Sequence, residues 1–422
     1  ILNSLILGWP EIFNLDIIFL STRVTAIILL AIIILCVLKI IHFQIQKIYH
    51  TLILIAPLWI FFLFTKDPDF LHYSTELLST TFLTLSYLLI KLDKNFSKKN
   101  TIIIAPILLG LVFFSKIQFF PVAIIIFLII LIELFLQKKD LRKYFISVFF
   151  FLLPSFIIFT LLFVSGNLKD FFINNFIFAY DFISFSQSKN ILFEVYSEKK
   201  INTAISVGEG FKKHLTLNLV FHIIYFYFFI SLLLLFKAIK IGFKSIIFNK
   251  DIIFISLIIL SLVAVILIPG KMHRHYLIAL VPFLPIFISQ LMCLIISDFK
   301  KETRFSFLSF FSIGFLILTM ISAFLEKDKF YSKKFDRIPF KKQNIHLSSP
   351  RIFQYLFDED KQTKLYIWGW MPKWYILSYM TPSSRETISE KQIIKNINRD
   401  YYRSRLLNDL NENKPDLIID FV

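Results

Sequence analysis

Basic side chains stand beside amide, imidazole and phenol groups in two short segments between apolar stretches. Lys116 and Gln118 belong to the four-residue turn 115–118. The second segment, 269–276, contains Lys271, Arg274, His275 and Tyr276. Lys and Arg are suitable counter-ions for a lipid phosphate at a membrane surface. We predict four phosphate-binding residues: Lys116, Lys271, Arg274 and His275. We also predict that Gln118 and Tyr276 contact the phosphate or a sugar. The alternative is that the basic residues are interfacial cations that extend toward water.

Three acids accompany these cations. Asp67, Asp69 and Glu76 lie in the short loop 66–76. A carboxylate beside a phosphate site can take a proton from an acceptor hydroxyl, or bind a divalent cation. The alternative is that they are solvated loop acids, with Asp67 as a helix N-cap before Pro68. We expect them to assist catalysis rather than to carry it.

Other chemistries have no support in the sequence. It contains no Gly-rich nucleotide loop after a strand, no serine elbow and no HExxH motif. His273 and His275 are two residues apart, which is poor helical spacing for metal ligands, so we predict no metal site from them. Cys36 and Cys293 fall inside apolar runs and are expected to pack as small hydrophobes. Any phosphate or sugar should therefore arrive attached to a lipid.

The elements that must position these residues are membrane helices. Of the 422 residues, 57% are hydrophobic, and the mean hydropathy is +0.71. A water-soluble globule could not bury that much apolar surface. The longer apolar stretches are 24–41, 48–65, 119–136, 144–165, 216–236, 252–268, 276–297 and 305–325. Two further stretches, 77–91 and 97–114, are shorter or more polar, as buried helices of a bundle can be. We predict an α-helical polytopic membrane protein with about ten transmembrane helices.

The net charge of +17 is explained by membrane orientation. Alternate loops, at 39–50, 91–100, 137–143, 237–250 and 298–304, hold 17 basic and four acidic residues. Because cytoplasmic loops retain Lys and Arg, these loops are predicted to be cytoplasmic. Glu133, near the inner end of its stretch, is expected to reach toward Lys138 and Lys139. Apolar helices separate the basic clusters, which disfavours nucleic-acid binding.

The chain is predicted to contain two parts. Residues 1–325 form the membrane bundle, with an outer interfacial loop at 166–215 that is rich in Phe, Tyr and Asn. Residues 326–422 form a small extracytoplasmic α/β domain. In this domain we predict short buried strands at 365–368 and 417–420. The spacing of apolar residues predicts a helix at 389–410.

Several motifs resemble the polyprenyl-phosphate-dependent glycosyltransferases of the C-type (GT-C) superfamily, such as the protein O-mannosyltransferase-like and aminoarabinose-transferase-like bacterial families. His275 followed by Tyr276-Leu-Ile-Ala-Leu-Val-Pro282 is similar to the start of a late helix in that superfamily. Gly8, Arg23, Glu76 and Ser115-Lys116 resemble earlier landmarks in the same order. The tail motifs are Tyr366-Ile-Trp-Gly-Trp-Met-Pro-Lys-Trp-Tyr375, Thr381-Pro-Ser-Ser-Arg385, Leu407-Asn-Asp-Leu410 and Lys414-Pro-Asp416.

The resemblance implies an inverting transfer of a sugar from a polyprenyl-phosphate carrier to a hydroxyl of a lipid, glycan or protein acceptor. The reaction would occur at the outer face of a bacterial inner (plasma) membrane. The family's catalytic Asp lies in the first outer loop, and Asp16 does not match that motif. We therefore expect the first helix, the loop after it and the main catalytic Asp to precede Ile1.

Two other functions fit part of the sequence. A transporter or flippase for lipid-linked glycans would use outer cations and polar helices, but would more often show paired repeats and mid-membrane charges. A non-catalytic assembly protein could use the aromatic residues of the tail to bind a partner. The helix centres are almost free of charge, which favours chemistry at the membrane surface.

Overall fold

The computed structural model describes 2–9, 19–46, 48–64, 73–93, 98–177, 227, 230–232, 234, 249–268, 274–297, 363–369, 375, 380–393 and 398–420. The chain divides into two compact units. Unit 1 comprises Ile1–Leu168 and Ile201–Phe330, and unit 2 comprises Lys169–Lys200 and Tyr331–Val422. Each unit is described by itself.

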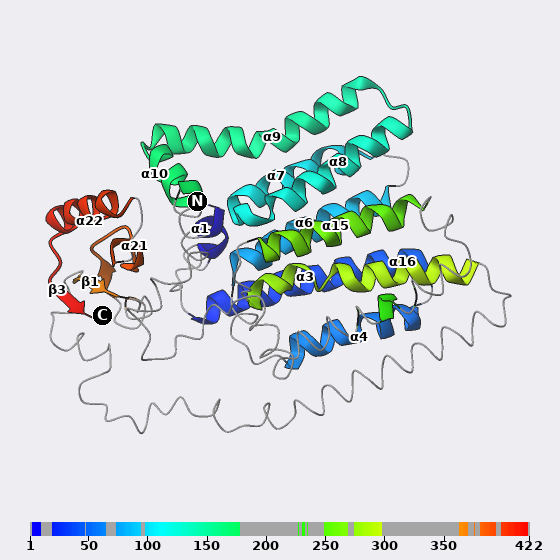
Figure 1. Cartoon of the computed structure of the whole chain (residues 1–422), viewed down its shortest axis with the longest axis horizontal. Coiled ribbons are helices and arrows are strands. Elements are labelled where there is room, and N and C mark those ends of the chain that lie inside the picture. Colours follow the sequence, from blue (N-terminus) through cyan, green and yellow to red (C-terminus); the bar gives the residue numbers. More distant parts are fainter. Residues whose placement is uncertain are drawn as a thin grey trace. The chain divides into compact units, whose positions relative to one another are not determined.

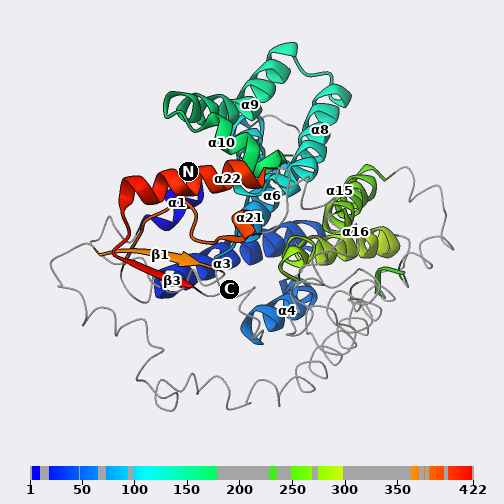
Figure 2. The same ribbon diagram turned by 60° about the vertical axis from the view of Figure 1, so that its left-hand side comes forward.

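Unit 1 is a bundle of helices that run side by side, as Figures 1 and 2 show. Its α-helices are α1 (Leu2–Leu7), α3 (Phe19–Ile45), α4 (Ile48–Phe64), α6 (Thr75–Leu92), α7 (Ala105–Ser115), α8 (Phe120–Leu136), α9 (Leu141–Val164), α15 (Lys250–Leu267) and α16 (Phe283–Ser297). Shorter turns precede three of them: the π-helix η1 (Asn100–Ile104) and the 3₁₀ helices η2 (Ile117–Phe119) and η4 (Arg274–Ala279). Each predicted apolar stretch that lies within the described residues is helical.

Five segments among the described residues are long and apolar enough to cross a membrane. They are Thr22–Ile45, Ile117–Leu136, Leu141–Val164, Lys250–Leu267 and His275–Leu294. Ile48–Trp59 and Asn100–Ser115 are shorter apolar helices. Of the other predicted stretches, 305–325 and most of 216–236 lie outside the described residues. The chain is thus a helical membrane protein, and the number of ten spans stays a prediction.

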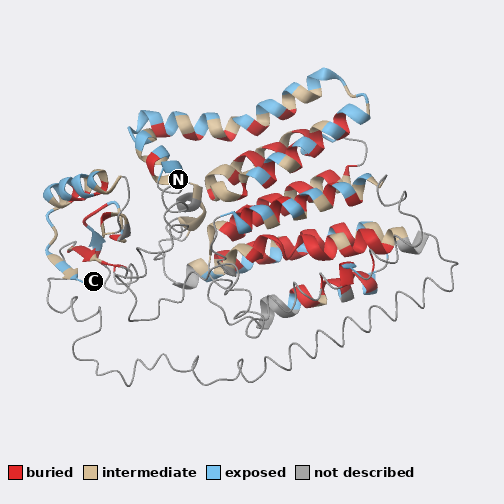
Figure 3. Ribbon diagram, viewed as in Figure 1, coloured by how far each residue is buried: buried red, intermediate tan, exposed pale blue. Residues whose placement is uncertain are grey.

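The surface of the bundle supports this assignment. Helix α9 has large apolar side chains on its exposed face, coloured pale blue in Figure 3. Phe145, Phe156 and Phe163 are each 72% exposed. Exposed apolar patches of this kind are rare on soluble monomers, whereas lipid tails cover them at no cost.

Helix α6 lies inside the bundle, packed against α3 and α7, although its sequence is rich in Ser and Thr. Its hydroxyls find partners within the protein. Thr80 and Thr81 donate to backbone carbonyls one turn earlier, at 2.7 and 2.8 Å. Ser79 and Ser115 share a 2.5 Å hydrogen bond that joins α6 to α7. The polar face of α6 therefore needs neither water nor ligand.

Close packing continues from α7 to α9. A Cβ atom at Gly110 would lie 2.2 Å from the Phe151 carbonyl oxygen and 3.2 Å from Pro154 Cγ. Only glycine permits this approach, which explains why a helix-weakening residue interrupts α7.

The predicted span 276–297 is not one continuous α-helix. It begins in η4 and continues, after the turn 280–282, as α16. Pro282 has no N–H group and restricts the residue before it, so the α-helix begins only after it. The turn leaves His275 and Tyr276 on a 3₁₀ segment beside α6.

Unit 2 contains a three-stranded parallel sheet in the order β2-β1-β3. The strands are β1 (Lys364–Trp368), β2 (Thr381–Pro382) and β3 (Leu417–Asp420), and the helices are α21 (Glu390–Ile393) and α22 (Arg399–Asn413). Both predicted strands are confirmed as strands, and β1 is buried as expected, but β3 is not, since Ile418 is 59% exposed. The predicted helix 389–410 corresponds to α21 and α22, with 394–397 outside the described residues. Strand β2 carries no periodic signal because it has two residues, one of them Pro382.

The core of unit 2 lies around β1. Leu365 and Ile367 are fully buried and pack with Tyr375 and Met380. Burial raises the pKa of Tyr366 to about 12, so its neutral hydroxyl shares a 2.9 Å hydrogen bond with Ser389.

A segment from the predicted outer loop 166–215 also belongs to unit 2. It consists of α10 (Leu168–Phe172) and the π-helix η3 (Ile173–Ile177). Arg405 of α22 binds Asp170 at 3.1 Å, and Lys391 Nζ donates to Asn174 Oδ1 at 2.6 Å. Unit 2 therefore contains both this segment and the C-terminal domain, whereas the sequence analysis assigns them to separate parts of the chain.

Candidate functional site

Four of the predicted site residues meet at one end of unit 1: Glu76 from α6, Lys116 from the turn after α7, and His275 and Tyr276 from η4. Lys116 Nζ lies 2.7 Å from Glu76 Oε1, and His275 Nε2 lies 3.7 Å from the same oxygen. The Lys116 ammonium also stands over the Tyr276 ring, 5.2 Å from its centroid. The His275 and Tyr276 rings meet edge to face at 4.7 Å. We call these four residues the Glu76 cluster.

The local sequence fixes the backbone of this cluster. Ser74 caps α6, with its Oγ accepting from Leu77 N–H at 3.1 Å, and Glu76 lies in the first turn, where the helix dipole favours a carboxylate. Lys116 ends α7 in an extended conformation, with φ −153°. The bond between Ser79 and Ser115 joins the two helices next to the ion pair.

Burial and charge both act on the Glu76 carboxyl, whose side chain is only 5% exposed. Burial alone would raise its pKa, but the Lys116 ammonium and His275 outweigh that effect, so the pKa of Glu76 lies below its ordinary value. Burial would likewise lower the pKa of Lys116, but the Glu76 charge outweighs it and the pKa lies above its ordinary value. Both groups are therefore ionised at neutral pH. Burial, with the Glu76 charge, raises the pKa of Tyr73, whose phenol stays neutral.

The ion pair determines which chemical roles are open to Glu76 and Lys116. A carboxylate with a lowered pKa that is bound to an ammonium is a weak proton acceptor. Its evident effect is to hold Lys116 in place and keep it charged. Lys116 is 28% exposed and an ammonium has three N–H donors, so it can bind an anion without leaving Glu76. The site can thus present a fixed positive charge at the edge of an apolar bundle.

The other predicted site residues are not brought into this cluster by any described contact. Gln118 Nε2 donates to the Val265 carbonyl at 2.5 Å and so joins η2 to α15. Arg274 begins η4 next to His275, but its side chain lies outside the described residues, as do Asp67, Asp69 and Lys271.

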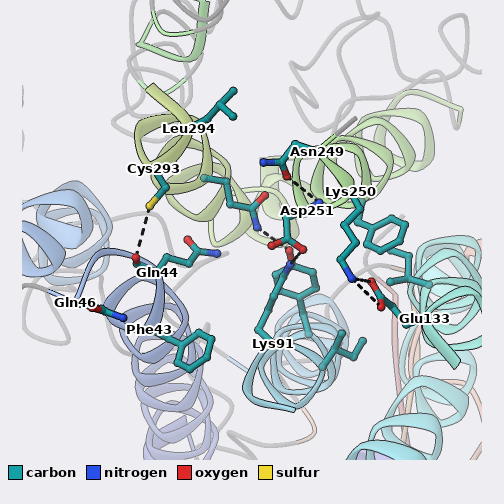
Figure 4. A pocket seen from close by; sticks show the side chains of 15 residues that line it. Phe43, Gln44, Gln46, Lys91, Glu133, Asn249, Lys250, Asp251, Cys293 and Leu294 are labelled. Carbon is teal, nitrogen blue, oxygen red and sulfur yellow. Dashed lines mark hydrogen bonds and ion pairs between the residues drawn. The ribbon is translucent and has the colours of Figure 1, made fainter. Parts of the chain in front are cut away.

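A second polar site, which the sequence did not reveal, lies at the opposite end of the bundle. It is a pocket of about 590 Å³, shown in Figure 4. Two ion pairs border it: Lys91 with Asp251 at 2.7 Å, and Lys250 with Glu133 at 2.8 Å. Deeper in the pocket, Gln290 Nε2 donates to the Tyr87 hydroxyl at 3.0 Å.

The pocket also corrects the expectation for Glu133, which pairs with Lys250 rather than with its neighbours Lys138 and Lys139. Lys250 begins α15, and Asn249 caps that helix through bonds to two backbone N–H groups. The partners in each ion pair are more than a hundred residues apart. No local spacing links them, and the only sequence signal is that charged residues occupy helix ends.

The two sites are separated by the length of a helix. Glu76 and Lys91 lie at the two ends of α6, and a rise of 1.5 Å per residue over this interval gives about 22 Å. That distance is most of the roughly 30 Å hydrocarbon core of a bilayer. Charged groups thus gather at both ends of the bundle, as a membrane requires.

No group of three His, Cys, Asp or Glu within the described ranges is placed to hold a metal ion. Comparison of the chain with protein-family models, with curated proteins and with solved structures gives no match.

Proposed function

We propose that the protein is an integral membrane glycosyltransferase. It moves a sugar from a polyprenyl-phosphate carrier to a hydroxyl of an acceptor lipid, glycan or protein. The observation that carries this proposal is the Glu76 cluster, in which three separate segments bring a fixed ammonium to one end of an apolar bundle. A lipid-linked phosphate at the membrane surface is the ligand that such a charge suits.

The distribution of basic residues supports an orientation for this site. If the Lys- and Arg-rich loops are cytoplasmic, the Glu76 cluster faces the outside of a bacterial plasma membrane. Ten spans and an extracytoplasmic unit 2 complete this topology. Apolar grooves between the helices would hold the polyprenyl chain.

The chemistry follows from the leaving group. The acceptor oxygen attacks the anomeric carbon, the bond from that carbon to the phosphate oxygen breaks, and the polyprenyl phosphate leaves with an added negative charge. A cation that is already fixed stabilises this charge without reorganisation. Lys116 takes this role, Arg274 and His275 of η4 assist it in this proposal, and Glu76 positions Lys116. The acceptor proton goes to a carboxylate, and Asp67 or Asp69 assists its transfer.

The test is sugar transfer by single variants of the complete protein. Membranes containing Lys116→Ala or Arg274→Ala are supplied with polyprenyl-phosphate [¹⁴C]mannose or [¹⁴C]glucose, and label is measured in lipid, glycan and protein fractions. We expect transfer to fall about a hundredfold or more, as when one preorganised charge donor is removed. Lys116→Arg should restore part of the activity, because it keeps the charge.

Arg23→Ala is the matched control. Arg23 is an exposed cation near the same end of the bundle, on α3, and its removal should leave transfer unchanged. All variants must be recovered in the membrane fraction at wild-type amounts. Wild-type transfer by both Lys116→Ala and Arg274→Ala would refute the proposal.

The second candidate function is translocation of a lipid-linked glycan, which the pocket at the opposite end of the bundle favours. A headgroup that crosses the membrane enters at one end of the bundle and leaves at the other, and polar groups at both ends can receive it. Reconstituted vesicles with a fluorescent polyprenyl-phosphate sugar distinguish the two functions. Movement of the label between leaflets with no transfer to an acceptor would favour translocation.

A further inference from the structure

We propose that the pocket between Lys91, Glu133 and Gln290 binds the headgroup of an amphiphile in which a phosphate stands beside hydrogen-bond donors. The donors can be an ammonium, as in an ethanolamine phospholipid, or hydroxyls, as in a glycosyl phosphate lipid. This site lies at the end of the bundle away from the Glu76 cluster. It does not depend on the proposed glycosyl transfer.

The charges around the pocket balance. Lys91 and Lys250 each face a carboxylate, Asp251 and Glu133 respectively. A simple anion that entered would meet two carboxylates as well as two ammonium groups. A ligand that carries both acceptors and donors finds a partner for each, and so the lining selects a mixed headgroup over inorganic phosphate.

Lys250 keeps binding capacity. An ammonium has three N–H donors, and that of Lys250 is paired with one carboxylate, that of Glu133. Lys91 is 11% exposed and contacts Tyr87 as well as Asp251, so it has less capacity. The Lys250 side chain is 56% exposed, so a phosphate oxygen can reach it without breaking its ion pair. Figure 4 shows both ion pairs among the side chains that line the pocket.

Gln290 indicates that the ligand carries hydrogen-bond donors. Its side chain is buried, and its Nε2 is used on the Tyr87 hydroxyl. Its Oε1 has no hydrogen-bond partner among the described residues. A buried amide oxygen without a partner is costly in a native structure, and its natural complement is an N–H or O–H group. A phosphate offers only acceptors at this point, whereas an ammonium or a sugar hydroxyl supplies the missing donor.

The remaining lining explains why the ligand is an amphiphile. Phe43, Ile90, Ile129, Phe254 and Leu294 provide an apolar wall. The volume is that of a small-molecule site, which is commonly several hundred Å³. A headgroup with the first part of its apolar tail fits this combination of a charged rim and an apolar wall.

The experiment measures binding of tritiated lipids to the purified full chain in dodecyl maltoside. In each of two pairs of probes, the first member has headgroup donors that the second lacks: phosphatidylethanolamine against phosphatidylcholine, and polyprenyl-phosphate mannose against polyprenyl phosphate. We expect the first member of at least one pair to bind at least tenfold more tightly than the second. The pair that discriminates identifies the source of the headgroup.

Variants connect the binding to the pocket. Gln290→Met keeps the side-chain volume and removes the acceptor, and Lys250→Ala removes an exposed phosphate partner. Each is expected to weaken binding about tenfold. Arg142→Ala, which removes an exposed cation from α9 at the same end of the bundle, is the control and should not change the affinity.

Three results would overturn the proposal. They are equal affinity within both lipid pairs, absence of binding by all four lipids, and unchanged binding by Lys250→Ala. Should Gln290→Met or Lys250→Ala fail to fold, the two lipid pairs, measured on the wild-type chain, still decide the question.

Discussion

Glu76 and Lys116 form an ion pair whose two members are unequally buried. The Glu76 side chain is 5% exposed and that of Lys116 is 28% exposed. Removing one partner of a buried pair leaves the other charge without compensation, and the cost depends on how deeply that charge is buried. The pair therefore predicts different effects for its two single variants.

We expect Lys116→Met to lower the free energy of unfolding by about 3 kcal/mol, because it isolates the buried Glu76 charge. Glu76→Gln should cost only about 1 kcal/mol, because water reaches the Lys116 that remains. The measurement is unfolding of the purified protein by SDS in mixed micelles. Equal costs, or a larger cost for Glu76→Gln, would contradict the unequal burial.

The pH dependence of stability has a defined sign. The pKa of Glu76 lies below its ordinary value of 4.5, so its contribution is fully present above pH 4.5 and is lost as the pH falls through the lower folded value. The stability curves of wild type and Glu76→Gln should therefore converge in acid. Glu412→Gln, at an exposed position of α22, is the control and should follow the wild-type curve throughout.

Residue types indicated part of the site. Lys116 and His275 are predicted as site residues because basic groups are scarce on the predicted outer side. Glu76 is predicted because a carboxylate beside a phosphate site can assist catalysis, and Tyr276 as a contact for the phosphate or sugar. Their spacing could not show that a carboxylate neutralises the lysine. The pocket beyond them was not predicted, because the pairing of Lys91 with Asp251 depends on how α6 and α15 pack.

At the scale of elements, apolar length predicted the described membrane helices well, because a helix in lipid must satisfy its own backbone. Apolar length could not show which helices are buried and which lie at the surface of the bundle. Helix α6 is rich in Ser and Thr and yet lies inside the bundle, because its hydroxyls bond to carbonyls one turn away. Helix α9 is more uniformly apolar and lies at the surface. In unit 2, long-range ion pairs rather than periodicity attach 169–177 to α22.

Arg405 provides the test of that attachment. Its side chain is 9% exposed and its two terminal nitrogens contact different acids, Asp170 at 3.1 Å and Glu386. Burial would lower the pKa of Arg405, but Glu386 and Asp170 together raise it, so the guanidinium stays charged. A lysine has a single charged atom and cannot span both carboxylates.

We expect Arg405→Lys to cost about 2 kcal/mol and to increase hydrogen exchange in the segment 169–177 several-fold. Arg403→Lys, the same change at an exposed position of the same helix, should leave that exchange unchanged. If Arg405→Lys also left it unchanged, the ion pairs would not hold the segment.

For the whole molecule, orientation is the property on which the proposed reaction depends. The predicted inner loops hold 17 basic and four acidic residues, whereas residues 326–422 hold 18 and 13. Most of the excess charge thus lies in short loops, where it controls insertion, rather than on a surface that binds a polyanion. The Glu76 cluster and the pocket would then face opposite sides of the membrane.

Cysteine labelling tests this orientation. In a background with Cys36→Ala and Cys293→Ala, we expect Glu412→Cys to react with a membrane-impermeant maleimide on intact cells, because unit 2 is predicted to lie outside. Arg142→Cys, at the start of α9, should react only after permeabilisation, because 137–143 is predicted to be a cytoplasmic loop. Both positions are exposed, so access rather than burial decides the result. The reverse pattern would put the Glu76 cluster on the cytoplasmic side, and transfer of a sugar at the outer face could then not involve Lys116.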